Sequence, residues 1–187
     1  MKNIVIFASG SGTNAEAIIL HFKNSKNTKV VGILSNNDKA GVLERAKNHQ
    51  IPSFTFSKSD LNSDTVLDII KPLNPDLIVL AGFLLKFPEN ILKHYPNKVI
   101  NIHPALLPNY GGKGMYGMHV HKAVLDNKEQ YTGITIHYVN EQYDEGAIIK
   151  QEKTFVGDCT LPEEIAQKVH ELEYKHFATT ISEILNE

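Results

Sequence analysis

The chain has 187 residues, of which 42% are hydrophobic and 21% are charged, and its formal net charge is −2. These values are typical of one soluble globular domain that is large enough to bury a core. They exclude a general electrostatic attraction to nucleic acid or to an anionic membrane, and the longest strongly apolar run, residues 77–85, is too short to span a bilayer.

Strand-like and helix-like segments alternate along the first part of the chain. Strand-like runs cover residues 4–8, 30–34, 53–56 and 77–81, and helix-like stretches cover residues 14–22, 41–49 and 61–70. The first and fourth runs are apolar throughout, as in strands that are buried on both faces of a parallel sheet. This alternation predicts right-handed βαβ crossovers and a doubly wound sheet.

The second part of the chain predicts a change in strand direction. A fifth strand, residues 98–103, follows a short helix that Pro88 opens. After a glycine-rich loop and another short helix, the runs 133–139 and 147–155 alternate polar and apolar residues, which favours a hairpin at the edge of a mixed sheet. A last helix begins near Thr160, where Glu163 has capping-box spacing. We therefore expect an α/β three-layer sandwich with a mostly parallel, doubly wound sheet and an antiparallel C-terminal portion.

The first predicted turn has the composition of an anion-binding loop. The first strand runs directly into Ser9-Gly10-Ser11-Gly12-Thr13-Asn14 and then into a helix. Glycines let the backbone approach a ligand closely, and free amides at a helix N-terminus attract an anion. A phosphate monoester fits better than a pyrophosphate, because the third glycine of the dinucleotide fingerprint is missing. The alternative is a tight turn in which Thr13 or Asn14 only caps the helix.

The end of the fifth strand carries the residues best suited to catalysis. Asn101 and His103 are two positions apart and therefore share a face of the strand, and Pro104 ends it at the edge where open α/β sheets bind ligands. An asparagine amide can stabilise an oxyanion and a histidine can transfer a proton, and acyl transfer to an amine needs both. The alternative is that both residues are structural: His103 hydrogen bonds to a buried backbone group, and Asn101 stabilises a turn.

A carboxylate would complete such a site. Asp144 and Glu145 lie in the loop between the last two predicted strands, from which either could reach the histidine. A carboxylate beside a catalytic histidine fixes its tautomer and stabilises its cationic form. Composition alone does not rank one acid over the other.

Four segments carry a resemblance to a known family. They are residues 6–14, 79–83, 101–108 (Asn-Ile-His-Pro-Ala-Leu-Leu-Pro) and 133–139 continuing to residues 144–146. Over essentially its whole length the chain resembles the glycinamide ribonucleotide formyltransferases, a family of folate-dependent formyltransferases. The resemblance implies a cytoplasmic enzyme of de novo purine biosynthesis that transfers a formyl group from the co-substrate 10-formyltetrahydrofolate to the amine of glycinamide ribonucleotide, without a metal. The single cysteine, Cys159, agrees with a reducing compartment.

The resemblance also implies roles for individual residues. The expected catalytic residues are Asn101, His103 and Asp144. The expected substrate-binding residues are Gly12, Thr13 and Asn14 at the phosphate and Glu173 at the ribose, with His170 added because it lies three positions before Glu173. The expected folate-binding residues are Phe83, Leu84, Leu85, Lys86, Phe87, Asn101 and His137. One domain, residues 1–187, would then have a phosphate-binding half at about 1–100 and a catalytic, folate-binding half at about 80–187.

Some positions leave their role open. Without the family, a solvated helix edge is the commoner place for His170 and Glu173. Some relatives have arginine where this chain has Leu85, which puts contacts to the folate's glutamate tail in doubt. The loop 109–117 contains four glycines and is either a mobile lid or a plain connector. His119 and His121 are two apart, but without a nearby acidic or cysteine partner we interpret them as helix-start residues rather than metal ligands.

Two other functions compete with this prediction. One is a formyltransferase that acts on an amino sugar nucleotide. The other is a non-catalytic module that binds a sugar phosphate through the Gly12 loop. An enzyme requires Asn101, His103 and Asp144 to converge on one cleft, whereas a binding module would leave them scattered.

Overall fold

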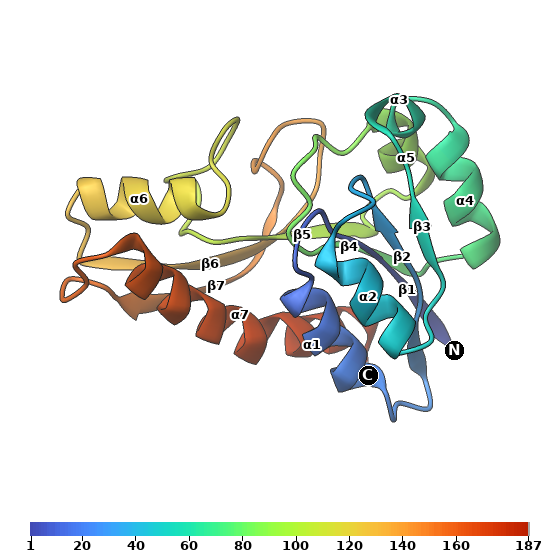
Figure 1. The fold of residues 1–187 in the computed structure, drawn as a ribbon, viewed down its shortest axis with the longest axis horizontal. Helices are drawn as coiled ribbons and strands as arrows, with labels where there is room; N and C mark the ends of the chain where they lie inside the picture. The colour runs from blue at the N-terminus through green and yellow to red at the C-terminus, as the bar shows by residue number, and fades with distance from the viewer. Residues whose placement is uncertain (187) are drawn as a thin grey trace.

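A seven-stranded mixed sheet organises the chain in the computed structural model, which describes residues 1–186 (Figure 1). Its strands are β1 (Lys2–Phe7), β2 (Thr28–Ser35), β3 (Ser53–Thr55), β4 (Leu77–Leu80), β5 (Val99–His103), β6 (Tyr131–Tyr138) and β7 (Ile148–Phe155). Their spatial order is β3-β2-β1-β4-β5-β6-β7. The first five strands pair in parallel, whereas β6 and β7 pair antiparallel. The predicted α/β fold class with its antiparallel C-terminal portion is therefore confirmed.

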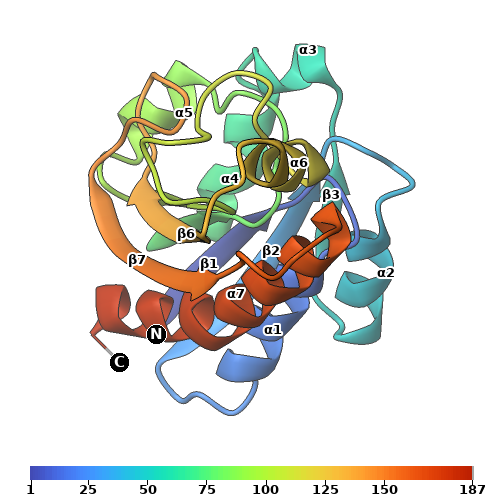
Figure 2. The ribbon, with the colours of Figure 1, turned by 90° about the vertical axis from the view of Figure 1, so that its left-hand side faces the viewer.

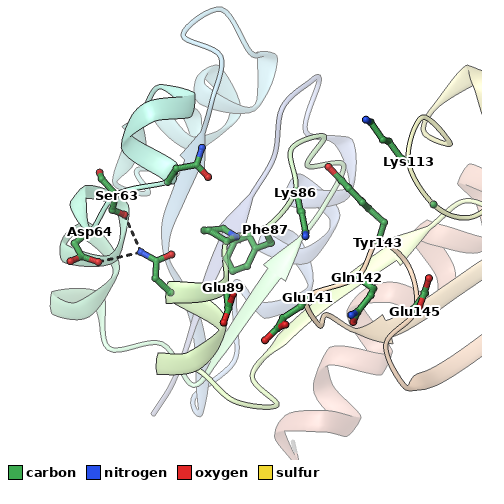
Figure 3. A pocket seen from close by; sticks show the side chains of 14 residues that line it. Ser63, Asp64, Lys86, Phe87, Glu89, Lys113, Glu141, Gln142, Tyr143 and Glu145 are labelled. Carbon is green, nitrogen blue, oxygen red and sulfur yellow. Dashed lines mark hydrogen bonds between the residues drawn. The ribbon is translucent and has the colours of Figure 1, made fainter.

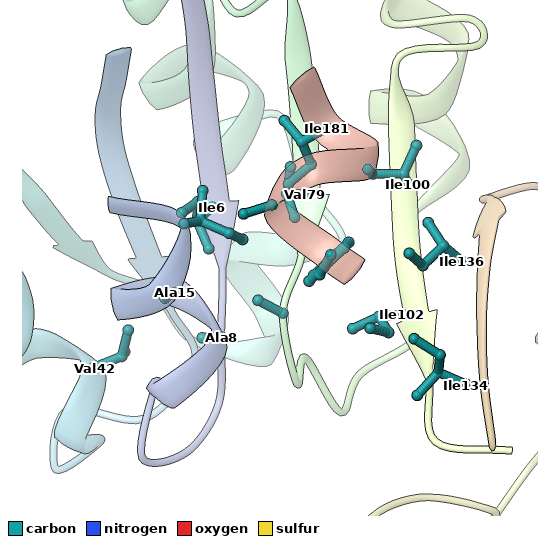
Figure 4. Close-up of a cluster of buried hydrophobic side chains, with 14 of the residues drawn as sticks. Ile6, Ala8, Ala15, Val42, Val79, Ile100, Ile102, Ile134, Ile136 and Ile181 are labelled. Carbon is teal, nitrogen blue, oxygen red and sulfur yellow. The ribbon is translucent and has the colours of Figure 1, made fainter. Parts of the chain in front are cut away.

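Helices cover both faces of this sheet, so the fold has three layers (Figure 2). They are α1 (Thr13–Phe22), α2 (Gly41–Asn48), α3 (Lys58–Leu61), α4 (Thr65–Leu73), α5 (Glu89–His94), α6 (Met118–Asp126) and α7 (Pro162–Leu185). Buried side chains of α1, α2, α6 and α7 pack on one face, and those of α3, α4 and α5 pack on the other. Figure 4 shows the first of these cores, where Ile181 of α7 and Ala15 of α1 lie against isoleucines and a valine of the central strands.

The strand order reverses at β1, and this places two loops side by side. β2 and β3 lie on one side of β1, and β4 lies on the other. At such a switch point the loops that follow the two central strands diverge and leave a crevice for a ligand. Here the two loops are tied together, because Ser9 N donates to the Gly82 carbonyl at 3.0 Å and Leu84 N donates to Ser9 Oγ at 3.0 Å. Ser9 itself is buried and also donates to Asn36.

The antiparallel pairing of β5 with β6 decides which side chains are neighbours across the sheet. Asn101 lies opposite His137, and His103 lies opposite Thr135. Ile100 and Ile102 of the same strand belong to the core on the α1 and α7 side. Asn101 and His103 alternate with these isoleucines, so they share the other face of the strand, as expected.

Two details of the helices differ from the sequence-based expectation. The helix expected over residues 61–70 is two helices, because a reciprocal capping box between Ser57 and Asp60 starts α3 early, and α4 starts again at Thr65. In α7 the acid that reaches back to the preceding amides is Glu164, which accepts hydrogen bonds from the amides of Thr160 and Leu161, and not Glu163. Within residues 1–186 the helices are all too short or too polar to cross a membrane.

Candidate active site

A cavity of about 470 Å³ lies at the carboxyl ends of β4 and β5. This volume is within the usual range for small-molecule sites. Its polar lining includes Asn101, His103, His121, His137, Asp144 and His170, and its apolar lining includes Phe83, Leu84, Leu85 and Phe87. The segments that the sequence analysis singled out at β4, β5 and the β6–β7 loop therefore meet in one cavity.

His103 is held at one ring nitrogen and faces a carboxylate with the other. The side chain is 4% exposed, and Nε2 lies 2.7 Å from the carbonyl oxygen of Tyr110. Because a carbonyl only accepts, Nε2 carries the hydrogen of this bond. Nδ1 then faces Asp144 Oδ2 at 3.6 Å. Burial lowers the pKa of His103 below its usual value, although the charge of Asp144 and the bond to Tyr110 oppose that shift.

Asp144 is the loop carboxylate that faces His103 and His137. Its second oxygen, Oδ1, lies 3.7 Å from Nε2 of His137, and Oδ2 accepts a hydrogen bond from the amide of Gly112 at 2.9 Å. Burial raises the pKa of Asp144, but the contacts with His137, His103 and the Gly112 amide outweigh it, so that the pKa lies below its usual value. Glu145 is exposed and lines a different hollow.

Asn101 is oriented by the histidine opposite it. Its Nδ2 donates to Nε2 of His137 at 3.1 Å, while Nδ1 of His137 donates to the carbonyl of Tyr138 at 2.9 Å. These two bonds agree on one tautomer of His137, with the hydrogen on Nδ1. An amide nitrogen has two hydrogens, so Asn101 keeps a second donor for a ligand. The alternative in which Asn101 only stabilises a turn does not fit this arrangement, whereas the bond of His103 to the Tyr110 carbonyl is the buried backbone contact that the same alternative expected.

The loop after β1 lies one strand away from the cavity. Gly12 has a φ of 75° and precedes α1, whose first amides receive no side-chain cap. The alternative in which Thr13 or Asn14 caps this helix is therefore wrong. Instead Asn14 Nδ2 donates to Glu173 Oε2 at 2.9 Å. Free amides at this helix start can accept an anion, but the loop residues are absent from the lining of the 470 Å³ cavity.

The two predicted residues of α7 lie in different surroundings. Glu173 is only 6% exposed, so the solvated edge that its position alone favoured is wrong for this residue. Burial raises the pKa of Glu173, against the effects of the Asn14 hydrogen bond and of His170. His170 is exposed but lines the rim of the cavity. The α7 pair thus connects the cavity to the loop at Gly12.

Arg45 contributes to this region in a way that the sequence analysis missed. Its Nε donates to the carbonyl of Ser11 at 2.8 Å, and its guanidinium also pairs with Glu16 of α1. The start of α2 packs equally closely, because a side chain at Gly12 would collide with Val42. The only arginine of the chain therefore supports the loop from behind. The residues next to Arg45 in the sequence do not indicate these partners.

An aromatic cluster fixes the segment expected to bind folate. Phe83 and Phe87 pack edge-to-face on Phe7 of β1, with ring centroids 5.4 and 5.1 Å apart from it. Phe83, Leu84, Leu85, Lys86 and Phe87 all line the cavity. This anchoring holds the backbone of the segment in place, which suits recognition of a flat ring by backbone groups.

A second hollow of about 1070 Å³ adjoins the first (Figure 3). Lys86, Phe87, Gly112, Lys113, Gln142 and Tyr143 line both. Its charged lining consists of two lysines, Lys86 and Lys113, and four acids, Asp64, Glu89, Glu141 and Glu145. The cavity therefore opens into a larger, more polar and partly acidic surface groove.

The loop 109–117 forms one wall of the cavity. Besides the contacts of Tyr110 with His103 and of Gly112 with Asp144, residues 112–117 all line it. His119 and His121 fall inside the first turn of α6, as expected. His119 is exposed, whereas His121 is buried and lines the cavity. Among the described residues no group of three or more histidine, cysteine, aspartate or glutamate side chains is arranged to hold a metal.

Comparisons with known proteins identify the family of the chain. A family model described as formyl transferase matches residues 2–181. A chloroplastic phosphoribosylglycinamide formyltransferase of Arabidopsis thaliana is 37% identical over the whole chain, which spans 66% of that relative's length. The phosphoribosylglycinamide formyltransferase of Bacillus subtilis is 34% identical, with 99% of this chain and 95% of that protein covered.

Solved structures extend the likeness to the fold. The crystal structure of phosphoribosylglycinamide formyltransferase from Bacillus halodurans superposes with a TM-score of 0.90 and 33% identity, covering 100% of this chain and 96% of that one. The enzyme of the same name from Anaplasma phagocytophilum gives a TM-score of 0.91 at 27% identity, covering 100% and 87%.

Proposed function

The chain belongs to the formyl transferase family, and on that premise we propose that it transfers a formyl group from 10-formyltetrahydrofolate to the amine of glycinamide ribonucleotide, a step of purine biosynthesis. The observation that carries the proposal is the position of His103, whose Nε2 is held by Tyr110 and whose Nδ1 is 3.6 Å from Asp144. A merely structural histidine does not need a carboxylate in front of its remaining lone pair.

His103 Nδ1 is the proton-transfer atom in this mechanism. With the hydrogen on Nε2, neutral Nδ1 and the Asp144 carboxylate are both acceptors, so a donor N–H between them satisfies both. The attacking amine of the acceptor supplies that N–H, and Nδ1 takes its proton as the new C–N bond forms. Asp144 then stabilises the imidazolium, and the same proton passes to the nitrogen that leaves the formyl carbon.

Asn101 stabilises the negative charge that develops on the formyl oxygen. Its amide is oriented by His137, which leaves the second N–H to donate to that oxygen. One well-placed donor of this kind lowers a barrier by about 3 kcal/mol. The formyl-folate supplies the activated one-carbon group, and the 470 Å³ cavity with its apolar segment 83–87 fits a flat ring system of that class.

The two substrates approach from different sides. The phosphate of the acceptor binds the amides at Gly12, Thr13 and Asn14, with Glu173 at the ribose and His170 at the rim. The ring of the donor lies against residues 83–87 and His137, and its glutamate tail leads into the hollow of Figure 3, where Lys86 and Lys113 are the available cations. Leu85 offers no charge to that tail.

A cytoplasmic location is part of the proposal, supported by the single cysteine and by the match to bacterial relatives over nearly their full length. The amino sugar nucleotide and the binding-module alternatives are not favoured. The relatives with the proposed activity in their names match the whole chain, and the catalytic trio converges rather than scatters.

The direct test is a formyl-transfer assay with glycinamide ribonucleotide and 10-formyltetrahydrofolate, with an amino sugar nucleotide as the alternative acceptor. His103→Ala should lower turnover by about 10²- to 10⁴-fold while ribonucleotide binding is retained. His94→Ala is the matched control, because His94 is an exposed histidine on α5 outside the cavity. Wild-type turnover of the amino sugar nucleotide alone, or equal loss of binding in His103→Ala, would contradict the proposal.

A further inference from the structure

His121 is a buried histidine that the proposed mechanism does not use. It is 2% exposed, lies on α6 and lines the cavity together with His103 and His170. Within residues 1–186 neither of its ring nitrogens has a hydrogen-bond partner, and Nδ1 is fully buried. The other two buried histidines of the cavity, His103 and His137, have partners at their nitrogens.

An unpartnered imidazole at this position is costly to the free protein. A buried polar group without a hydrogen bond loses its hydration and gains nothing in return. Leucine would fill similar space next to Val120 and Val124 without that penalty. A polar side chain left unsatisfied at the wall of a ligand cavity indicates that its partner arrives with the ligand.

The charge state of His121 restricts what that partner is. Burial, followed by the electrostatic influence of the neighbouring His170 and His103, lowers the pKa of His121 to about 4. The imidazole is therefore neutral near pH 7, with one donor and one acceptor nitrogen. One donor and one acceptor together match a neutral polar group such as an amide, whereas a phosphate dianion offers acceptors only.

The neighbours of His121 indicate which part of the acceptor it meets. His103 marks the end where the amine reacts, and His170 marks the side of α7 where ribose and phosphate bind. Both are close enough to His121 to influence its protonation. In glycinamide ribonucleotide the neutral polar group between the amine and the ribose is the carboxamide.

We propose that His121 is a positioning residue that hydrogen bonds to the carboxamide of the acceptor and so holds the amine in line with Nδ1 of His103. This inference rests on the proposed function and adds to it a contact at a defined group of one substrate. It predicts that the acceptor, and not the folate, senses the loss of the imidazole.

His121→Leu tests the proposal, and His119→Leu on the exposed side of the same helix turn is its matched control. We expect His121→Leu to lower kcat/KM for glycinamide ribonucleotide by roughly tenfold, with the KM for formyl-folate changed less than twofold. The melting temperature should stay level or rise, because an unsatisfied polar group is removed. His121→Asn or His121→Gln should recover part of the loss, since each presents a donor and an acceptor.

The possible results distinguish a failure of this inference from a failure of the proposed formyl-transfer function. Unchanged kcat/KM for the acceptor in His121→Leu overturns the inference. So does a lower melting temperature together with raised KM for both substrates and no recovery in the amide variants, because that pattern is structural. If His121→Leu does not fold, the amide variants and the thermal shift that the ribonucleotide produces in them decide the question. Absence of formyl transfer by the wild-type protein would instead refute the proposed function itself.

Discussion

Asn14 Nδ2 donates a hydrogen bond to Glu173 Oε2 across 2.9 Å, although the two residues are 159 positions apart in the sequence. The contact joins the loop after β1 to the last helix. Asn14 is partly buried and Glu173 is buried. The other amide atom, Asn14 Oδ1, is buried and has no hydrogen-bond partner among residues 1–186. The proposed phosphate loop and the proposed ribose-binding carboxylate are thereby held as one unit.

Asn14→Ala should weaken binding of the ribonucleotide, because it removes the side-chain donor that holds the carboxylate of Glu173 beside the loop after β1. We expect the KM for the ribonucleotide to rise by roughly tenfold, with the KM for formyl-folate unchanged. Steady-state kinetics with each substrate varied in turn would measure this. An unaltered ribonucleotide KM would remove Asn14 from the phosphate site.

Glu173→Gln separates the charge of this residue from its shape. Burial raises the pKa of Glu173, so the ionised form is destabilised in the folded protein and its contribution to stability declines as the pH rises above the usual pKa of a glutamate. Glutamine still accepts from Asn14 but carries no charge. The variant should therefore melt at the same or a higher temperature than wild type at pH 7, while its ribonucleotide KM rises. Scanning calorimetry and kinetics on the same preparation would test both, and a clear drop in melting temperature would refute the electrostatic reasoning.

Asp144→Asn should shift the acid limb of the pH profile and lower turnover. His103 must be neutral to take a proton, so activity falls as the pH drops through the pKa of His103, which burial places below its usual value. Asp144 stays ionised there, because its own pKa is lowered. Removing its charge removes an influence that raises the pKa of His103, so the limb should move to lower pH. Turnover should fall by about 10²- to 10⁴-fold; a limb that moved to higher pH would contradict the assignment.

Arg45→Lys tests whether the phosphate loop needs support from behind. Lysine retains the charge beside Glu16 but lacks the fork that also donates to the Ser11 carbonyl. We expect a several-fold rise in ribonucleotide KM with nearly constant kcat and folate KM. Lys47→Arg on the same helix is a control for helix composition, because Lys47 is exposed. If Arg45→Lys altered kcat and left the ribonucleotide KM unchanged, the proposed support of the loop by Arg45 would be wrong.

Sequence periodicity was sufficient to predict features that depend only on neighbouring residues of one strand. The two-residue spacing of Asn101 and His103 determined that they share a face, because successive strand residues point to opposite sides. The continuously apolar first and fourth runs determined the buried centre of a parallel sheet. The break between α3 and α4 was missed, because it depends on a local capping box at Ser57 that competes with the apolar pattern.

Contacts between distant segments came only from the tertiary structure. The choice of Asp144 over Glu145 depends on a positive φ of 56° at Asp144 and on the amide of Gly112, which lies 32 positions earlier. The carbonyl of Tyr110 places the hydrogen of His103 on Nε2. Every residue has a backbone carbonyl, so the sequence does not indicate which one bonds to the histidine.

The sequence by itself therefore determined the fold class, the strand end that we propose carries the chemistry, and the family resemblance. Only the folded chain showed that Asp144, which the resemblance implied but composition did not rank, faces the histidines, that Glu173 is buried and that Arg45 supports the loop at Ser11. The physical reason is that periodicity and local propensity act within about ten residues, whereas burial, pKa and hydrogen-bond partners depend on what other parts of the chain bring to the same place.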